Sequence, residues 1–419
     1  MATLEFFRLQ TREEVLAQYN RFAPVGVEEV ELAAAGGRVL AAPVPAPEDV
    51  PTFLRAGMDG YAVRAKDTFG AGVGAPQYLE IKGEVPMGAA PPRGVGPGEA
   101  LRVPTGAMLP AGADAVVMLE YTAEHPDGTL EVRKPVAPGE SVLQPGEDVR
   151  LGEVLFSSGT RLRPQEIGLL AALGVTTLTV YRRPRVAVLS SGDEVVPLDQ
   201  NPAPGQVRDC NAYLTAAQVQ EWGGLPILKG IIPDDFASLK NALTEALGEA
   251  DLILISGGSS VGARDLTLTA IKALPGAQIL AHGVAIRPGK PTILASLREK
   301  AKKGGKPLLG LPGHPASAAV VMEVLGRPLI NRLAGLKPPS SWGGTVTALL
   351  SRNLAGASGR EDYVRVRLRL ADDTLWADPI LGPSGLLSPL VKSDGLVMIP
   401  LGVEGLNRDD PVSVRLFGN

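Results

Sequence analysis

The chain has 419 residues, of which 45% are hydrophobic and 21% charged, as in globular proteins with more than one domain. Its net charge of -4 gives no overall attraction to nucleic acid or to an anionic membrane. The single cysteine excludes an internal disulfide, and three scattered histidines exclude a zinc site of usual spacing, so any metal should have oxygen ligands.

The N-terminus predicts helices and no targeting segment. Residues 11–22 and 27–44 favour one or two short helices, with Thr11 as N-cap and the pair Gly36 and Gly37 as a break. There is no apolar core of signal-peptide length and no apolar run approaching about 18 residues. We therefore expect a soluble, cytoplasmic protein.

A β-rich module interrupts the N-terminal domain. Short apolar runs separated by Pro and Gly predict strands in residues 48–141, with a hairpin turn at "HPDG", 125–128. Residues 142–181 contain a further helix with Pro164 in its first turn. We expect this segment to pack with residues 1–47 as one domain.

Residues 182–335 predict a different architecture. Short apolar strands alternate with amphipathic helices, which is typical of a doubly wound α/β domain with a parallel sheet covered on both sides. Right-handed crossovers place the loops that follow the strands at one edge of such a sheet.

The C-terminal residues 336–419 predict a small β barrel. In "DYVRVRLRLADDTLWADPI", Asp372 and Asp373 form a hairpin turn between two strands. The alternation of the first strand predicts a solvent-facing stripe of three arginines, Arg365, Arg367 and Arg369.

Polar residues gather in five loops at the predicted strand ends. The loops are "SSGDE" (190–194), "PDD" (233–235), "SGGSSVGARD" (256–265), "RPGKP" (287–291) and "LPGHPAS" (311–317). Ligands of open α/β sheets bind at this edge. We expect Glu194, Asp234, Asp265 and Lys290 to converge on one crevice.

The glycine-rich loop is suited to phosphate. Gly257 and Gly258 let the main chain approach a ligand closely, and Ser256 adds a donor. Carboxylates beside phosphate repel it unless a hard cation such as Mg²⁺ lies between them. Positive charge would come from Arg287 and Lys290. The sequence therefore predicts a phosphorylated ligand with magnesium bridging it to Asp265.

Simpler structural explanations exist for several of these residues. A single glycine-rich loop is often only a tight turn. Asp235 can cap the helix that follows it, as Asp234 can. His314 in a turn is usually structural, and Cys210 has the character of a small buried residue.

Six motifs in order resemble the molybdopterin molybdenumtransferase family, which includes MoeA and the E-domain of gephyrin. They are "MDGYA" (58–62), "PTGAMLPAGADAVV" (104–117), "SSGDE", "SGGSSVGARD", "RPGKP" and "LPGHPAS". The similarity runs from about residue 7 to the end. It implies a four-domain homodimer that, with Mg²⁺, inserts molybdenum from molybdate into adenylylated molybdopterin and releases AMP.

The resemblance also implies roles for individual residues. Asp59, Glu194 and Asp265 would be catalytic, with Asp59 and Thr105 reaching the crevice of the partner subunit. Glu194, Asp234 and Asp265 would serve the metal. The substrate would be bound by a larger set: Thr105, Asp234, Ser256, Gly257, Gly258, Arg287, Lys290, Pro312, Gly313, Arg360 and Ser384. His314 stands where the family commonly has Asn, so no role is carried to it.

Two other functions fit parts of the sequence. An adenylyltransferase that makes the nucleotide uses a related α/β domain, but it lacks the extra β modules. A non-catalytic scaffold could use the same dimer to cluster partners, although the charged residues Asp59, Glu194, Asp265 and Lys290 argue for catalysis. The resemblance also allows contacts with other proteins of the molybdenum cofactor pathway.

Overall fold

A computed structural model describes residues 9–257, 261–298, 305–337 and 344–418, without the side chains of 261–265. The chain forms two compact units. The first comprises Met1–Ala42, Ser158–Ile167 and Thr177–Asn419, and the second comprises Pro43–Ser157 and Gly168–Thr176. Each unit is described by itself below. Within the described ranges, no helix has the length and apolar character that crossing a membrane requires.

The N-terminal part of the first unit begins with a capped helix. Helix α1 (Arg12–Ala17) has Thr11 as N-cap, which accepts from the Glu14 amide at 3.2 Å, while the Glu14 carboxylate accepts from the Thr11 amide at 2.8 Å. The prediction of this cap is confirmed. The helix expected from residue 27 is wrong, because Val27–Glu31 forms strand β1, paired antiparallel with β12 (Thr177–Tyr181).

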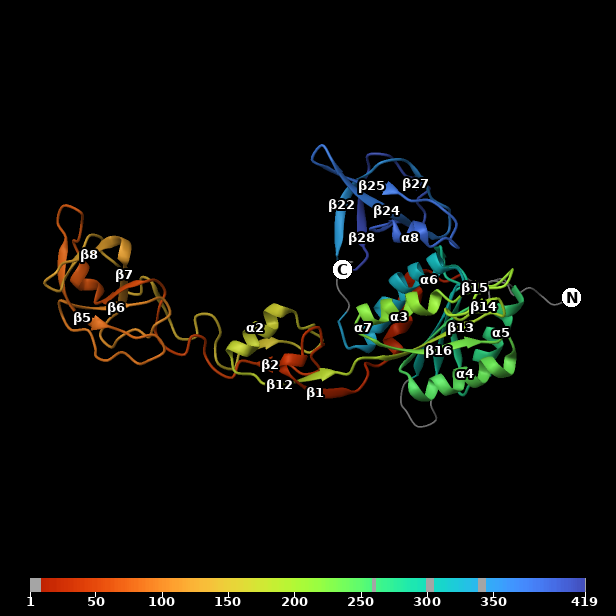
Figure 1. Cartoon of the computed structure of the whole chain (residues 1–419), viewed down its shortest axis with the longest axis horizontal. Coiled ribbons are helices and arrows are strands. Elements are labelled where there is room, and N and C mark those ends of the chain that lie inside the picture. The colour runs from red at the N-terminus through yellow and green to blue at the C-terminus, as the bar shows by residue number, and fades with distance from the viewer. Residues whose placement is uncertain (1–8, 258–260, 299–304, 338–343, 419) are drawn as a thin grey trace. The chain divides into compact units, whose positions relative to one another are not determined.

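The central domain is a six-stranded sheet in the order β16-β13-β17-β21-β20-β18 (Figure 1). Strands β16, β13, β17 and β21 are parallel, as the sequence predicts. The bounds of the strands are Arg185–Ser191 (β13), Leu225–Ile232 (β16), Leu252–Ser256 (β17), Gln278–His282 (β18), Ile293–Leu297 (β20) and Lys306–Leu311 (β21).

Helices cover both faces of this sheet because its strands are apolar on both sides. Val186 and Val188 of β13 pack in one core with residues of α3 and α6, whereas Ala187 and Leu189 pack in another with residues of α4 and α5. Figure 1 shows the two helix layers on opposite sides of the strands. The helices are α3 (Asn211–Glu221), α4 (Phe236–Glu249), α5 (Val261–Lys272), α6 (Pro315–Val321) and α7 (Arg327–Leu333).

Two strands depart from the parallel arrangement. Strand β20 runs antiparallel to β21, with Ile293 opposite Gly310, and β18 runs antiparallel to β20. The loop 287–291 therefore precedes an antiparallel strand instead of following a parallel one. It lies nonetheless at the predicted edge, because the start of β20 is beside the end of β21.

The C-terminal residues form a closed barrel of five strands. Strand β24 (Glu361–Ala371) pairs with both β25 (Thr374–Pro379) and β26 (Gly395–Ile399), and β22 (Thr345–Leu350) and β28 (Pro411–Leu416) close the circle. Asp372 and Asp373 have positive φ and form the predicted hairpin turn. Strand β19 (Ile286–Arg287) of the central segment pairs with β24 and so ties the barrel to the α/β domain.

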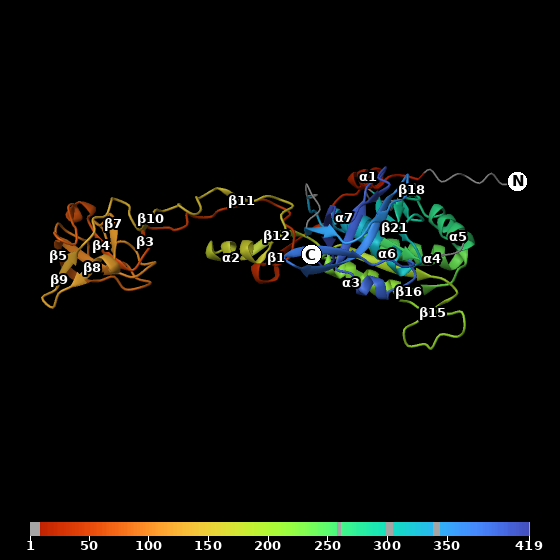
Figure 2. The same ribbon diagram turned by 90° about the horizontal axis from the view of Figure 1, so that it is seen from above.

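The second unit contains a six-stranded sheet in the order β7-β4-β6-β5-β9-β8 (Figure 2). Its strands are Gly60–Val63 (β4), Gln77–Glu84 (β5), Glu99–Val103 (β6), Ala115–Met118 (β7), Thr122–Glu124 (β8) and Thr129–Val132 (β9). The "HPDG" turn joins β8 and β9, with Gly128 at positive φ. Gly60 is required at its place, because a Cβ there would lie 2.0 Å from the carbonyl oxygen of Val117.

Short elements complete the chain. Helix α2 (Pro164–Ala172) begins at Pro164, as predicted. The short strands are Val44–Pro45 (β2), Arg55–Ala56 (β3), Val142–Leu143 (β10), Val154–Phe156 (β11), Val195–Val196 (β14), Val207–Arg208 (β15), Leu354–Ala355 (β23) and Gly405–Leu406 (β27). Helix α8 spans Ser388–Val391, and 3-10 turns cover Gln18–Arg21, Leu32–Ala34, Ala65–Thr68 and Leu119–Tyr121.

A buried carboxylate docks the barrel on the helical layer. Glu323 lies in a π-helical turn (Met322–Gly326) between α6 and α7 and is 3% exposed. Its Oε1 is 2.7 Å from Nε of Arg415 in β28 and 3.0 Å from Nη1 of Arg327. This carboxylate therefore forms an ion pair with one guanidinium group of the barrel and with one of the helical layer.

Replacing Glu323 should therefore destabilise the protein strongly. We expect Glu323→Gln to lower the free energy of unfolding by about 3 kcal/mol, because it removes the buried carboxylate that forms ion pairs with two partly buried guanidinium groups. Asp378→Asn, which removes the partly exposed pair with Arg369 at 2.9 Å, should cost less than about 1 kcal/mol. Urea unfolding measures both, and equal losses would contradict the role given to Glu323.

Candidate functional site

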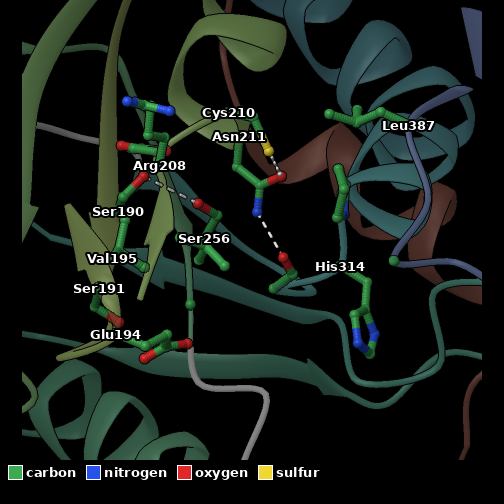
Figure 3. A pocket seen from close by; sticks show the side chains of 16 residues that line it. Ser190, Ser191, Glu194, Val195, Arg208, Cys210, Asn211, Ser256, His314 and Leu387 are labelled. Atoms are coloured by element: carbon green, nitrogen blue, oxygen red, sulfur yellow. Dashed lines mark hydrogen bonds between the residues drawn. The ribbon is translucent and has the colours of Figure 1, made fainter. Parts of the chain in front are cut away.

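A cavity of 330 Å³ lies at the carboxyl ends of β13 and β17. We call it the sheet-edge pocket (Figure 3). Its wall consists of strand ends and of loops from both the α/β domain and the barrel: Ser190, Ser191, Glu194, Val195, Val207, Arg208, Asp209, Cys210, Asn211, Ser256, Gly257, Gly313, His314, Pro315, Gly385 and Leu387.

Serine hydroxyls form the floor of this pocket. The Oγ atoms of Ser190 and Ser256 are 3.3 Å apart, and both residues are buried. Gly257 is needed for a reason that the sequence did not reveal, because a Cβ there would lie 2.2 Å from Oγ of Ser191. The glycine lets two strand ends approach each other, so hydroxyl donors from both strands face one cavity.

The turn before α6 forms the opposite wall. The side chain of Asn211 donates to the carbonyl oxygen of Gly313 at 2.7 Å and so fixes this turn, while Pro312 is buried. His314 is exposed, and Figure 3 shows it on the side of the view away from Glu194. Cys210 is only half-buried, and its burial raises the pKa of the thiol, which disfavours a thiolate nucleophile.

Three carboxylates lie beside the serines. Asp193 and Glu194 follow β13, and Asp234 follows β16 with its amide 3.2 Å from Oδ1 of Asp193. Burial and then the charges of Asp193 and Glu194 raise the pKa of Asp234, against a lowering by Ser191. One oxygen of Asp234 is buried without a hydrogen bond of normal geometry in the described residues. A cation bound next to Asp234 would lower its pKa and would also give the buried oxygen a partner.

The carboxylates do not enclose a metal ion by themselves. Among the side chains that the structure describes, no three His, Cys, Asp or Glu residues are grouped closely enough to hold one. Mg²⁺ is commonly held by one or two carboxylates plus phosphate oxygens and water, which this arrangement allows. Asp235 caps α4 by accepting from the Ser238 amide at 2.9 Å, so its alternative explanation is confirmed.

A second cavity of 340 Å³ adjoins the first. We call it the arginine pocket, lined by Arg287, Pro288, Ala316, Asp362, Tyr363, Val364, Arg365, Ile380, Leu381, Gly382 and Ser384. The two cavities meet at two turns. His314 and Gly385 line the sheet-edge pocket, whereas their near neighbours Ala316 and Ser384 line the arginine pocket, and the Ala316 amide donates to the Ser384 carbonyl at 3.1 Å.

A buried carboxylate organises the arginine pocket. Asp362 is 1% exposed and lies 2.7 Å from Nη2 of Arg287 and 3.4 Å from Nε of Arg360. The arrangement joins a side chain of the α/β domain to two of the barrel. Arg287 and Arg360 thus share one buried carboxylate.

Arg365 is a functional candidate that the sequence pattern missed. Its predicted exposure is wrong, because the side chain is 9% exposed and lines the arginine pocket. Its Nη2 donates to the Gly382 carbonyl at 2.9 Å, whereas its Nη1 has no acceptor among the described residues. Burial lowers the pKa of Arg365, because the charged guanidinium group has lost contact with water. An anion bound in the pocket would stabilise this charge and would accept a hydrogen bond from Nη1.

Several expected site residues line neither cavity. Asp59 and Thr105 belong to the second unit, and Asp234, Pro312 and Arg360 of the first unit are not among the lining residues. Lys290 is exposed and lines neither pocket. Gly258 and the side chain of Asp265 lie outside the described residues, although the backbone of Asp265 belongs to α5. Glu194, Ser256, Gly257 and Gly313 line the sheet-edge pocket.

Asp59 and Thr105 form a separate pair in the second unit. Oδ1 of Asp59 accepts from the Thr105 amide at 2.6 Å and from its hydroxyl at 2.8 Å. These bonds lower the pKa of Asp59, because they favour its charged form. The pair presents a fixed, ionised carboxylate at the surface.

Three family models together match most of the chain. One described as MoeA N-terminal region (domain I and II) matches residues 10–174. One described as a probable molybdopterin binding domain matches residues 187–332, and one described as MoeA C-terminal region (domain IV) matches residues 347–417.

Whole-chain relatives agree with these matches. Molybdopterin molybdenumtransferase of Nostoc sp. is 38% identical over 386 residues, covering 90% of this chain and 85% of that protein. The enzyme of that name from Haemophilus influenzae is 31% identical over 98% of both chains. A crystal structure of the molybdopterin biosynthesis MoeA protein from Pyrococcus horikoshii aligns with a TM-score of 0.78 and 37% identity, covering 98% of this chain and 99% of that one.

The raised pKa of Asp234 predicts a stability change with a defined sign. A carboxyl whose pKa is raised by folding destabilises the folded state once pH exceeds that pKa, and the cost is absent at low pH. Asp234→Asn should therefore raise the thermal midpoint at pH 7, by about 1–2 °C. Added Mg²⁺ should stabilise the native protein more than the variant. A lower midpoint for the variant at pH 7 would contradict this account.

The Asp59 pair predicts a change in titration. Thr105→Val removes the hydroxyl donor, so the pKa of Asp59 should rise toward its ordinary value, whereas Thr105→Ser should leave it low. Carboxyl-carbon NMR titration of Asp59 measures both variants. An unchanged pKa in Thr105→Val would show that the backbone amide alone holds the carboxylate.

Proposed function

Since this chain belongs to the MoeA family, we propose that it is a molybdopterin molybdenumtransferase of molybdenum cofactor biosynthesis. Its substrates would be adenylylated molybdopterin and molybdate, and AMP would be released. The observation that carries this proposal is the junction of a hydroxyl-lined pocket with an arginine-lined pocket.

The charge of the arginine pocket favours a dianion. Arg287 and Arg365 line the pocket, and Arg360 pairs with the lining carboxylate of Asp362 without lining the pocket itself. Three guanidinium groups are thus offset by one carboxylate. The remaining two positive charges match molybdate, a tetrahedral dianion, and guanidinium groups bind such oxygens by directed hydrogen bonds. Ser384 also lines this pocket, next to Gly385, which lines the sheet-edge pocket.

The sheet-edge pocket is suited to the phosphates and the pterin. Ser190, Ser191 and Ser256 offer hydroxyl donors at the carboxyl edge of parallel strands, where nucleotides bind in such folds. The turn containing Gly313 would bound the ligand on the other side. A substrate lying across both pockets would bring its pterin end toward the bound molybdate.

We propose Glu194, Asp234 and Asp265 as the residues that hold Mg²⁺ together with substrate phosphate oxygens. The crowded and partly buried Asp234 supports this assignment. When bound, magnesium would screen the phosphates and stabilise the charge that develops as AMP leaves. The protein's own contribution is to fix the phosphates by the serines and the oxyanion by the arginines.

The assembly proposed with this function is a cytoplasmic homodimer. Asp59 and Thr105 of one subunit would complete the site of the other, as an ionised carboxylate at the surface permits. The proposed domains are residues 1–47 with 142–181, residues 48–141, residues 182–335 and residues 336–419. Lys290 is proposed to contact substrate from its exposed loop.

An adenylyltransferase and a non-catalytic scaffold remain the alternatives that the experiment must separate. The barrel supplies Asp362, Arg365 and Ser384 of the arginine pocket, together with Arg360, the second partner of Asp362. A lone α/β domain lacks these residues. A scaffold has no need for a buried guanidinium group with an unsatisfied donor.

The decisive measurement is AMP release from adenylylated molybdopterin in the presence of Mg²⁺ and molybdate. We expect molybdate-dependent turnover, nearly abolished in Asp265→Ala. Arg365→Gln should raise the KM for molybdate by about tenfold or more, because it removes a charged ligand of the oxyanion.

Arg369→Gln is the matched control, since Arg369 is an exposed arginine on the same strand, paired with Asp378. It should leave the KM for molybdate unchanged. Turnover independent of molybdate, or equal effects of the two arginine substitutions, would contradict the proposal.

A further inference from the structure

A third cavity, of 180 Å³, is lined by arginines at a different edge of the sheet. We call it the amino-edge pocket. Its lining residues are Gly36, Gly37, Arg38, Val39, Arg161, Tyr181, Arg182, Arg183, Gln220, Glu221, Trp222, Gly223 and Ala334. Four of these side chains are guanidinium groups, and one, that of Glu221, is a carboxylate.

The topology separates this pocket from the substrate site. Arg182 and Arg183 immediately precede β13, and Trp222 and Gly223 lie between α3 and β16. The pocket is therefore at the amino ends of β13 and β16, whereas the sheet-edge pocket is at the carboxyl end of β13. A ligand here would be a second ligand and not part of the substrate.

Two of the four arginines are already neutralised. Arg38 pairs with Glu28 and donates to the Tyr181 carbonyl at 2.9 Å. Nη2 of Arg182 lies 3.6 Å from Oδ1 of Asp251. These pairs hold two walls of the pocket and leave the other two arginines to act on a ligand.

Arg161 and Arg183 have no carboxylate partner in the part of the chain that the structure describes. Arg161 is half-buried, and the one side-chain hydrogen bond that it forms with the described residues, to Oδ1 of Asn331, is long at 3.4 Å. Burial and the charge of Arg327 lower the pKa of Arg161. A half-buried cation without a counter-ion is costly unless an anion is bound beside it.

Trp222 points to the same kind of ligand. Its side chain is 4% exposed, and the indole N–H has no acceptor among the described residues. The guanidinium group of Arg327 lies 5.9 Å from the centre of its ring. Buried donors normally have a partner, and an oxygen of an anion in this pocket can supply one.

We propose that the amino-edge pocket binds a small inorganic oxyanion, such as phosphate or molybdate, through Arg161, Arg183 and Trp222. Guanidinium groups and an N–H donor are the usual ligands of tetrahedral oxyanions. A volume of 180 Å³ accommodates such an ion and is about half that of either substrate cavity, which argues against a whole nucleotide.

The bound ion would join two parts of the first unit. Arg161 lies beside the N-terminal strands, with Val39 as its β-bridge partner, whereas Trp222 belongs to the end of α3. Oxyanion binding should thus couple the N-terminal segment to the α/β domain.

Trp222 provides a direct readout. The chain has three tryptophans, so the double substitution Trp342→Phe with Trp376→Phe leaves Trp222 as the sole emitter. Titration of this full-length protein with phosphate, and separately with molybdate, at low ionic strength should give a saturable change in its fluorescence. AMP should bind at least tenfold more weakly than phosphate.

Substitutions of the unpaired arginines should weaken this binding. We expect Arg161→Gln to lower the affinity tenfold or more. Arg183→Gln, at an exposed position, should lower it at least threefold. Arg185→Gln is the matched control, because Arg185 is exposed and close in sequence but does not line the pocket. It should change nothing.

Calorimetry with molybdate separates this site from the substrate site. Wild type should bind two ions per chain, Arg161→Gln should lose one, and Arg365→Gln should lose the other. Absence of the fluorescence change, unchanged binding in both Arg161→Gln and Arg183→Gln, or AMP binding as tight as phosphate would overturn the proposal. So would a change of oligomeric mass in these variants without loss of anion binding, since the pocket would then be covered by a second copy.

Discussion

The carboxylate of Asp362 is the element on which the arginine pocket depends. It is almost fully buried in the barrel, yet its partner Arg287 comes from the segment that leads into β20. The same segment pairs with β24 through β19, so backbone hydrogen bonds and an ion pair act at one place. Without this junction the barrel would offer Arg365 and the α/β domain would offer Arg287, but neither would form a cationic cavity.

The described parts of the site divide the chemistry between two kinds of surface. Hydroxyl groups at strand ends, packed closely because Gly257 lacks a side chain, face one cavity, and guanidinium groups face the other. The turns that contain His314 and Gly385 contribute residues to both cavities. The separation of the two kinds of surface allows a negatively charged organic ligand and a negatively charged inorganic one to lie near each other without sharing a single counter-ion.

Much of this arrangement was predictable from sequence, because buried parallel strands and amphipathic helices leave clear periodic patterns. The motifs at the strand ends placed Glu194, Ser256 and Gly313 at the correct edge. Local patterns failed where a distant partner decides the outcome. Val27–Glu31 becomes a strand because β12 pairs with it, and Arg365 is buried because loops of the barrel cover one end of an otherwise exposed arginine stripe. The arginine pocket therefore could not be predicted from local sequence patterns.

The double use of Asp362 limits how the molecule can diverge. A residue that sets the charge of a binding cavity can usually be exchanged when the ligand changes, but this one also fastens two folding modules to each other. A change of Asp362 that alters the preferred ion would therefore require compensating changes in the α/β domain and in the barrel, where its partners Arg287 and Arg360 lie. Ion selectivity and the association of the barrel with the α/β domain consequently depend on the same residue.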